Sequence, residues 1–220
     1  MKYLRKFETE ADVVMMVQPN VVLVGDEARI LYNVEPPKGA FIQHIDGNLY
    51  TTDQWSAMGF TNGEANGVAV ISDNAKFVIA KTSLGKMAWS SDTSNAVEGV
   101  MLTSDSTTAK TDYAGAANTA LISAIDTGKA AYKCANFTFP NGAKGYLPAL
   151  GEWVDAYAYK ADVDAAMALI DGTAISESYS HWSSTQFSAD RAWLLYWGNG
   201  FAYSDDKINP DDDVRAFSAL

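Results

Sequence analysis

The chain of 220 residues is predicted to be an α+β protein in which two main helices lie beside small antiparallel sheets. Short segments rich in Val, Ile and Phe occupy its first third and are typical of β-strands. Two Ala-rich stretches with helical spacing follow, and beyond residue 178 no helical period remains. This order of strands, helices, and then strands and loops favours helices packed at one side of a sheet.

Residues 1–38 are predicted to form a β-rich arm. The segment "VVLVGDEARILYNV" contains two apolar runs joined through Gly25-Asp26-Glu27, which is the pattern of a hairpin. "EPPKG" at residues 35–39 ends the arm because proline cannot donate to a strand ladder. An arm this short cannot bury a sizeable core, so we expect it to dock on the main domain or to mediate self-association, for example as a trimer.

Residues 39–220 are predicted to form the main domain. Its first strands are expected at "AFIQHIDG", "GVAVIS" and "KFVIAKT". Apolar residues at helical spacing predict one helix near residues 112–126 and a second near 148–170. Pro148 suits the first turn of the second helix, and Gly172 suits its C-terminal end.

Composition excludes several classes of partner. The net charge of -11 argues against a nucleic-acid surface and against an anionic membrane, both of which need clustered Lys and Arg. The apolar runs near the N-terminus are too short and too interrupted for a signal peptide or a membrane span, so we expect a soluble protein made in the cytoplasm. Cys134 is the single cysteine, which excludes an intramolecular disulfide and favours a buried apolar role.

The first specific motif is "GYLPALGEW" at residues 145–153. Pro148 presets a helical turn, Glu152 lies near the positive end of the helix dipole, and Trp153 shares a face with Leu150. An ordinary capped helix accounts for these features. The residue order also resembles the helix of the C-type-lectin fold group that includes formylglycine-generating-enzyme-like domains.

The second motif lies in the tail, where Trp182-Ser183-Ser184-Thr185-Gln186 is followed by Ala192-Trp193, Gly200, Lys207 and Val214-Arg215. This pattern resembles the carboxy-terminal part of lectin-fold proteins that are diversified by retroelements in gut Bacteroides and their phages. The resemblance implies a C-type-lectin-like fold for residues 39–220 and a variable region over about 178–217. It covers residues 112–220 strongly and the rest of the chain weakly.

In such systems, errors at template adenines turn AAY codons into NNY codons, which cannot encode Trp, Gln, Lys, Glu or Met. The tail residues of these types are Glu177, Trp182, Gln186, Trp193, Trp197 and Lys207. The resemblance therefore implies a scaffold that includes Trp153, Trp182, Trp193, Trp197 and Arg215. It implies a variable, ligand-binding surface made of Ser180, His181, Phe187, Asp190, Arg191, Leu194, Gly198, Phe201, Ala202, Ser204, Asp205, Asp206, Asp211, Asp212 and Asp213.

The strand "AWLLYW" is predicted to alternate, with Trp193, Leu195 and Trp197 facing the core and with Leu194 and Tyr196 on the other face. Tryptophans bury a large area and carry an N–H that seeks a partner, so they can hold irregular backbone in place. The alternative is an ordinary Trp-rich β core with polar loops.

No metal or cofactor is predicted. "DDKINPDDD" at residues 205–213 offers carboxylates, but an EF-hand needs Gly and Glu where Pro210 and Ala216 stand, and calcium there remains an alternative. The sugar-binding motifs of calcium-dependent lectins are missing from the lectin-like region. His44 and His181 are too far apart to indicate a metal motif, and "GNG" at residues 198–200 is typical of a turn.

These observations favour a non-catalytic protein that displays a variable surface to a protein or glycan receptor, on a phage tail fibre or a cell surface. One alternative is a structural virion or fimbrial subunit without a selected ligand. An enzyme related to lectin-fold oxidases is disfavoured, because their chemistry needs a pair of cysteines and this chain has Cys134 alone.

Overall fold

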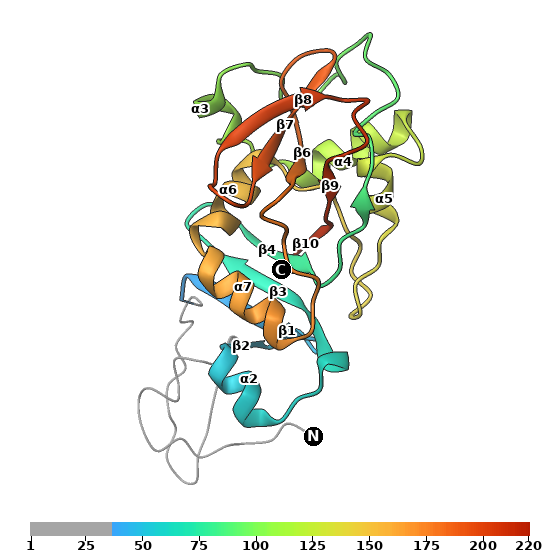
Figure 1. Cartoon of the computed structure of the whole chain (residues 1–220). Coiled ribbons are helices and arrows are strands. Elements are labelled where there is room, and N and C mark those ends of the chain that lie inside the picture. Colours follow the sequence, from blue (N-terminus) through green and yellow to red (C-terminus); the bar gives the residue numbers. More distant parts are fainter. Residues whose placement is uncertain (1–36) are drawn as a thin grey trace, which may run out of the picture.

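The structure is a computed structural model that describes residues 37–220 (Figure 1). Two five-stranded sheets are stacked along the molecule with helices packed beside them, which confirms the α+β class. The first sheet has the order β10-β4-β3-β1-β2 and the second has the order β5-β9-β6-β7-β8. The predicted arm at residues 1–38 lies, except for its last two residues, outside the described part of the chain.

The first sheet is antiparallel throughout. The strand β3 is buried along its whole length, because α7 packs on one side of the sheet and a second apolar cluster lies on the other. At Gly67 the strands approach so closely that a Cβ would lie 2.4 Å from the Ile79 carbonyl oxygen. The strands of this sheet are β1 (Gly39–His44), β2 (Leu49–Tyr50), β3 (Ala65–Ile71), β4 (Lys76–Ala80) and β10 (Phe217–Ala219).

The second sheet contains most of the predicted variable region. Its centre is β6, which pairs antiparallel with β7 and parallel with β9 through His181 and Asp213. β8 pairs with β7 and forms one edge of the sheet (Figure 1). The strands are β5 (Gly85–Lys86), β6 (Ser180–Gln186), β7 (Arg191–Tyr196), β8 (Ala202–Asp206) and β9 (Asp213–Val214).

The first predicted helix, expected at residues 112–126, is α4 (Gly115–Ile125). The structure adds short helices that the periodicity did not predict, since each has too few turns to show a repeat. The clearest is α2, whose N-terminus is capped by Thr51 and Gln54 in a reciprocal capping box. These additional helices are α2 (Thr52–Met58), the 3-10 turn η1 (Asn62–Glu64), α3 (Ser106–Ala109) and α5 (Ala130–Asn136).

The helix expected over residues 148–170 is two helices, α6 (Leu150–Ala158) and α7 (Lys160–Leu169). Tyr159 between them has φ −110° and ψ 25°, so the chain changes direction there (Figure 1). α6 packs on β6 and β7 of the second sheet, whereas α7 packs on β1 and β3 of the first. Periodicity alone did not reveal the break because both halves carry an apolar stripe, each toward a different sheet.

The core consists of two apolar clusters on opposite sides of the sheets. Trp193, Leu195 and Trp197 belong to one cluster, as predicted. Leu194 belongs to the other, together with Trp182. The prediction that only one face of this strand meets a core is therefore wrong, because Leu194 on the second face belongs to a second buried cluster that includes Trp89, Val100 and Ile122.

Among residues 37–220, no helix combines the length and the apolar character that crossing a membrane requires.

Candidate functional site

The motif Trp182–Gln186 is buried in the centre of the second sheet, and its side chains bind neighbouring segments. Ser183 Oγ donates to the Trp193 carbonyl at 2.8 Å, and Thr185 Oγ1 donates to Asp112 Oδ2 at 2.8 Å. Gln186 binds the backbone of Val97 in both directions, at 2.8 and 3.0 Å. The register of β6 against β7 is irregular across these residues, so polar side chains take over part of the pairing.

Each tryptophan of the motif region uses its indole N–H to bind another segment. The residues Trp153, Trp182, Trp193 and Trp197 are all buried, as predicted. Their acceptors are, in that order, the carbonyls of Trp182, Met87 and Thr103 and the carboxylate of Asp164, at 3.0, 2.9, 2.8 and 3.0 Å. The rings therefore combine apolar burial with fixed polar links between α6, α7 and the second sheet.

Lys207 is completely buried, which is rare for a lysine. Its Nζ donates to Gln186 Oε1 at 2.9 Å and to the Ala189 carbonyl at 2.7 Å, and it lies 4.7 Å from the centre of the Trp89 ring. Burial lowers the pKa of Lys207 to about 8, although Asp190 and Asp92 act in the opposite direction. We call Trp182, Gln186, Trp193, Trp197 and Lys207 the frame.

Arg215, predicted as a scaffold residue, is completely buried. Its guanidinium donates to the carbonyls of Ala80 at 3.0 Å and Thr173 at 2.9 Å. Burial lowers its pKa to about 10, and nearby Asp213 opposes this. Arg215 therefore joins the end of β4 to the segment that follows α7.

Glu152 of the "LPALGEW" motif is buried at the start of α6. It accepts hydrogen bonds from the Ala149 N–H and from the Tyr146 hydroxyl, both at 2.7 Å. Burial raises its pKa to about 7, although these two hydrogen bonds act in the opposite direction. A Cβ at Gly115 would lie 2.1 Å from Glu152 Oε2, so α4 and α6 meet at a position that requires glycine.

The residues predicted to form the variable surface do not share one environment. Some are exposed, namely Asp190, Gly198, Phe201, Asp206 and Asp211. Others are half-buried, namely Ser180, Phe187, Arg191, Ala202, Ser204 and Asp205. The remaining ones, His181, Leu194, Asp212 and Asp213, are buried, and the prediction that they face solvent is wrong.

The burial of His181 and Asp213 follows from the pairing of β6 with β9. His181 Nε2 lies 3.0 Å from the Ser176 carbonyl oxygen, and its Nδ1 lies 3.3 Å from Asp213 Oδ2. Burial alone would raise the pKa of Asp213, but hydrogen bonds from His181 and Ser83 outweigh it and lower that pKa. Both residues therefore belong to the interior and not to a binding surface.

Three aromatic side chains form what we call the aromatic face: Tyr196 at the end of β7, Phe201 directly before β8, and Tyr203 on β8. Phe201 is 63% exposed and Tyr203 is 45% exposed. The Tyr203 ring centre lies 6.4 Å from those of Tyr196 and Phe201, in edge-to-face geometry. Sequence reasoning identified Phe201 and missed the two tyrosines, although the alternation in "FAY" carried the signal.

Carboxyl groups lie beside the aromatic face, because Asp205 follows Tyr203 by two residues and shares its side of β8. Asn209 Nδ2 lies 2.7 Å from Asp205 Oδ2 and 3.4 Å from Asp212 Oδ2, so it connects the two carboxyl groups. Burial, together with the charges of Asp205 and Asp211, raises the pKa of Asp212 to about 7. Asp212 is therefore buried against this site and not displayed on it.

The outer edge of β8 is partly closed. Ser204 lies opposite Trp193 as a non-hydrogen-bonded pair, so its backbone groups point away from β7. Arg191 Nη2 donates to the Ser204 carbonyl at 2.6 Å, and Asp205 Oδ1 accepts from the Asp206 N–H at 2.7 Å. These side chains occupy backbone groups that an added strand would need.

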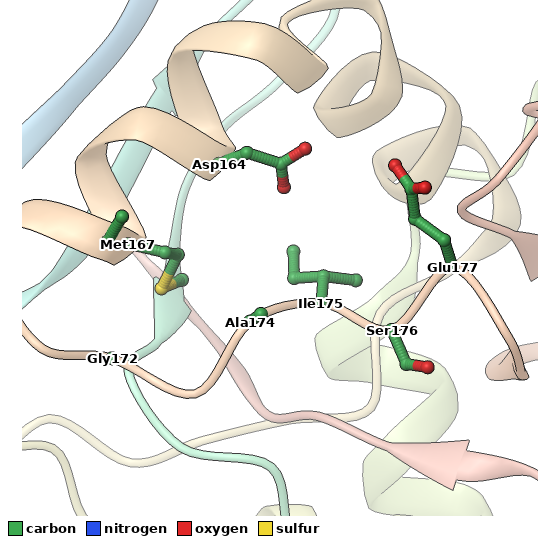
Figure 2. Close-up of a pocket in the computed structure, with 8 residues that line it drawn as sticks. Asp164, Met167, Gly172, Ala174, Ile175, Ser176 and Glu177 are labelled. Carbon is green, nitrogen blue, oxygen red and sulfur yellow. The ribbon is translucent and has the colours of Figure 1, made fainter.

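A hollow of about 300 Å³ lies between α7 and residues 172–177 (Figure 2). Met167 and Ile175 provide apolar surface, and the carboxylates of Asp164 and Glu177 stand at its rim. Lys160 Nζ lies 2.5 Å from an oxygen of each carboxylate. The acidic groups of this hollow therefore already have a cation.

No group of three or more His, Cys, Asp and Glu side chains within residues 37–220 is arranged to hold a metal ion. Cys134 is buried, and that burial raises the pKa of its thiol.

No protein-family profile matches the chain, and no curated protein matches it significantly. The fold is similar to the crystal structure of a fimbrial protein from Bacteroides ovatus ATCC 8483, with a TM-score of 0.58 over 84% of this chain. The two sequences are 11% identical, so the likeness concerns the fold. The similarity covers 49% of the fimbrial protein, so this chain spans about half of its length.

Proposed function

We propose that this chain is a non-catalytic binding protein that presents the aromatic face to a receptor on a C-type-lectin-like scaffold. The observation that supports this most directly is the contrast between the aromatic face and the frame beneath it. Phe201 and Tyr203 are exposed, while Trp193 on the adjacent strand is buried. Exposed aromatic side chains on a rigid sheet are typical of sites where a partner binds.

The same contrast supports diversification of the tail. The frame residues are of types that NNY codons cannot encode, and all of them are buried. Phe201, Asp206 and Asp211 are of permitted types and are exposed. Glu177 departs from this pattern, since it is of an excluded type and is exposed. His181, Leu194, Asp212 and Asp213 depart from it in the opposite way, since they are of permitted types and are buried. Diversification confined to the exposed residues of permitted types would change the surface that meets a receptor.

The likeness to a fimbrial protein supports display at a cell surface, where such a receptor-binding module would act in adhesion. A phage tail fibre remains the other place of display implied by the tail motif. In both settings the receptor would be a protein or a glycan on a cell.

A structural fimbrial subunit without a selected ligand is the second candidate, and the fold likeness favours it. In that case polymerisation would bury a surface of this chain, and the aromatic face would have no receptor. The partly closed edge of β8 argues against assembly by strand addition at that edge, because Arg191 and Asp205 occupy its backbone groups.

Binding of fluorescently labelled full-length protein to intact Bacteroides cells, and to other gut bacteria, tests the proposal. The double variant Phe201→Ser/Tyr203→Ser removes the exposed rings, and Ile125→Ser on α4 is a matched control, since Ile125 is 67% exposed. We expect saturable binding that the double variant loses and the control retains.

Equal cell binding by wild type and by the double variant would contradict the proposal. Concentration-dependent polymers of the wild-type protein, unchanged in the double variant and without cell binding, would support the structural subunit instead.

A further inference from the structure

The helix α4 turns polar side chains toward the interior. Asn118 Nδ2 donates to Asp112 Oδ2 at 2.9 Å, and Thr119 Oγ1 accepts from the Leu147 N–H at 2.8 Å. The exposed positions of the helix all carry apolar side chains, namely Ala116, Ala117, Ala120, Leu121, Ala124 and Ile125. A helix at a protein surface ordinarily has its polar side chains on the outside. We call these six exposed residues the α4 face.

The α4 face is solvent-exposed and lies on a helix that is fixed in place. Ile125 is 67% exposed and Leu121 is 42% exposed. The inner side of α4 packs on β6 and on the neighbouring α5 (Figure 1). A Cβ at Gly99 would lie 3.1 Å from Leu121 Cδ1, so the chain at Gly99 borders the face. Apolar area presented in this way is typical of an interface between protein chains.

The sizes of the side chains favour a second copy of the same helix as the partner. Both large residues of the α4 face lie in its C-terminal half, and its N-terminal half is alanine. Consider a second α4 that lies antiparallel on the first, with a two-fold axis between residues 120 and 121. Leu121 then meets Ala120 of the second copy, and Ile125 meets Ala116. Each large side chain meets a small one, so the two helices can pack closely. A two-fold interface requires this self-complementarity.

The distribution of charge favours the same partner. The chain has a net charge of -11, so two copies repel each other wherever their carboxylates meet. The α4 face carries no charged side chain, and α4 has neither an acidic residue in its first turn nor a basic one in its last. Two copies can therefore meet there without burying an unpaired charge. The antiparallel arrangement also places the positive end of each helix dipole beside the negative end of the other.

We propose that two copies of this chain pair through the α4 face in an antiparallel, two-fold contact. The face offers less than the roughly 800 Å² per partner of a stable interface, because four of its six residues are alanine. We therefore expect a dissociation constant on the order of 10–100 µM. The pair would form where copies are held close together, as on a fibre or at a cell surface.

The pairing does not depend on the receptor binding proposed above, and it uses no residue of the aromatic face. Below about 1 µM the chain should be monomeric, given the expected dissociation constant. Receptor binding measured at such concentrations is then independent of the dimer, and Ile125→Ser retains it. Failure of either proposal would leave the other in place.

Sedimentation equilibrium of the full-length protein, from about 1 to about 500 µM, tests the proposal. Ala120→Glu places two like charges beside the two-fold axis and keeps a residue that favours helix. We expect it to raise the dissociation constant at least about tenfold. Ala165→Glu, at an exposed position on α7, is the matched control and should dimerise as the wild type does.

Cysteine cross-linking tests the register. The antiparallel contact places Ala117 opposite Ala124 of the second copy, so Ala117→Cys/Ala124→Cys should give a disulfide-linked dimer on mild oxidation. Ala117→Cys alone should not, because the two copies of residue 117 would lie about 10 Å apart along the helix axis. A disulfide needs Cα atoms within about 7 Å. The native Cys134 is buried and should not interfere.

A wild-type protein that stays monomeric at the highest concentration, with no cross-linked dimer, would overturn the proposal. Dimers that Ala120→Glu leaves unchanged would place the contact on another surface and would overturn it as well. Equal cross-linking by the single and the double cysteine variants would exclude the antiparallel register.

Discussion

Lys207 Nζ and Gln186 Oε1 form a 2.9 Å hydrogen bond in which both side chains are completely buried. The contact joins the end of β6 to the turn that follows β8. Tyr203 of the aromatic face lies on β8, four residues before Lys207. Gln186 Oε1 also accepts from the Val97 N–H at 2.8 Å, so one amide oxygen holds two loops. The rigidity of the binding surface therefore depends on a polar contact as well as on tryptophan packing.

We predict that Lys207→Met lowers the free energy of unfolding by about 1–3 kcal/mol, because the half-buried Ala189 carbonyl loses its donor and buried Gln186 Oε1 loses one of its two donors. Thermal and denaturant unfolding measure the change. Lys133→Met, at an exposed position on α5, is the control and should stay within about 0.5 kcal/mol. If Lys207→Met leaves the free energy of unfolding unchanged, the lysine does not stabilise the frame.

A second prediction concerns alkaline pH. The folded protein disfavours protonated Lys207, so between about pH 8 and its ordinary pKa of 10.5 the unfolded chain binds more protons than the folded one. The stability contribution of this residue should therefore rise with pH over that interval. Lys207→Met should abolish the rise, as measured by unfolding across the pH series. If the free energy of unfolding changes equally with pH in the wild type and in Lys207→Met, the rise does not come from Lys207.

Between about pH 4 and pH 7 we expect the stability of the folded protein to fall as pH rises. Burial raises the pKa of Glu152 and Asp212 to about 7, so from about pH 4 to 7 the folded protein retains protons that the unfolded chain has lost. Their contribution to stability should fall as pH rises through this range. Asp212→Asn should flatten the dependence and raise stability at pH 8. Asp162→Asn, at an exposed position, should change neither property.

Because the frame is buried and the aromatic face is exposed, we predict that substitutions in the two have very different effects on stability. Trp193→Ala should cost about 3–5 kcal/mol, because it leaves a cavity and leaves the Thr103 carbonyl without its donor. Phe201→Ala should change stability by less than about 0.5 kcal/mol, since that ring is 63% exposed. Chemical denaturation measures both. A large loss for Phe201→Ala would show that the aromatic face is part of the core.

The contact between α4 and α6 predicts that Gly115→Ala is destabilising by about 1–3 kcal/mol. The new methyl group would meet Glu152 Oε2 at 2.1 Å and the Ala149 nitrogen at 2.9 Å. Gly63→Ala is the matched control, because its nearest neighbour would be the Thr61 hydroxyl at 3.8 Å. Differential scanning calorimetry should separate the two variants clearly, and similar melting temperatures would contradict the close approach seen here.

Several features followed from the sequence alone. The α+β class came from the change of period along the chain, and the buried state of Trp153, Trp182, Trp193 and Trp197 came from residue types that are costly to expose. The scaffold role predicted for Arg215 agrees with its burial and its carbonyl contacts. The change of period and the cost of exposing a tryptophan are local properties, whereas the role of Arg215 came from the family resemblance, and its acceptors Ala80 and Thr173 lie far from it in the chain.

Other features depended on segments far apart in the sequence. Leu194 is buried because the second face of β7 joins an apolar cluster built from several distant segments, and His181 is buried because β9 returns beside β6. Alternation along a strand assigns side chains to two faces, but it does not state which faces another segment will cover. The break at Tyr159, the joining of Asp205 to Asp212 and the exposure of Tyr203 were likewise decided by tertiary packing. Burial is a property of the whole fold, whereas periodicity is a property of the strand or helix alone.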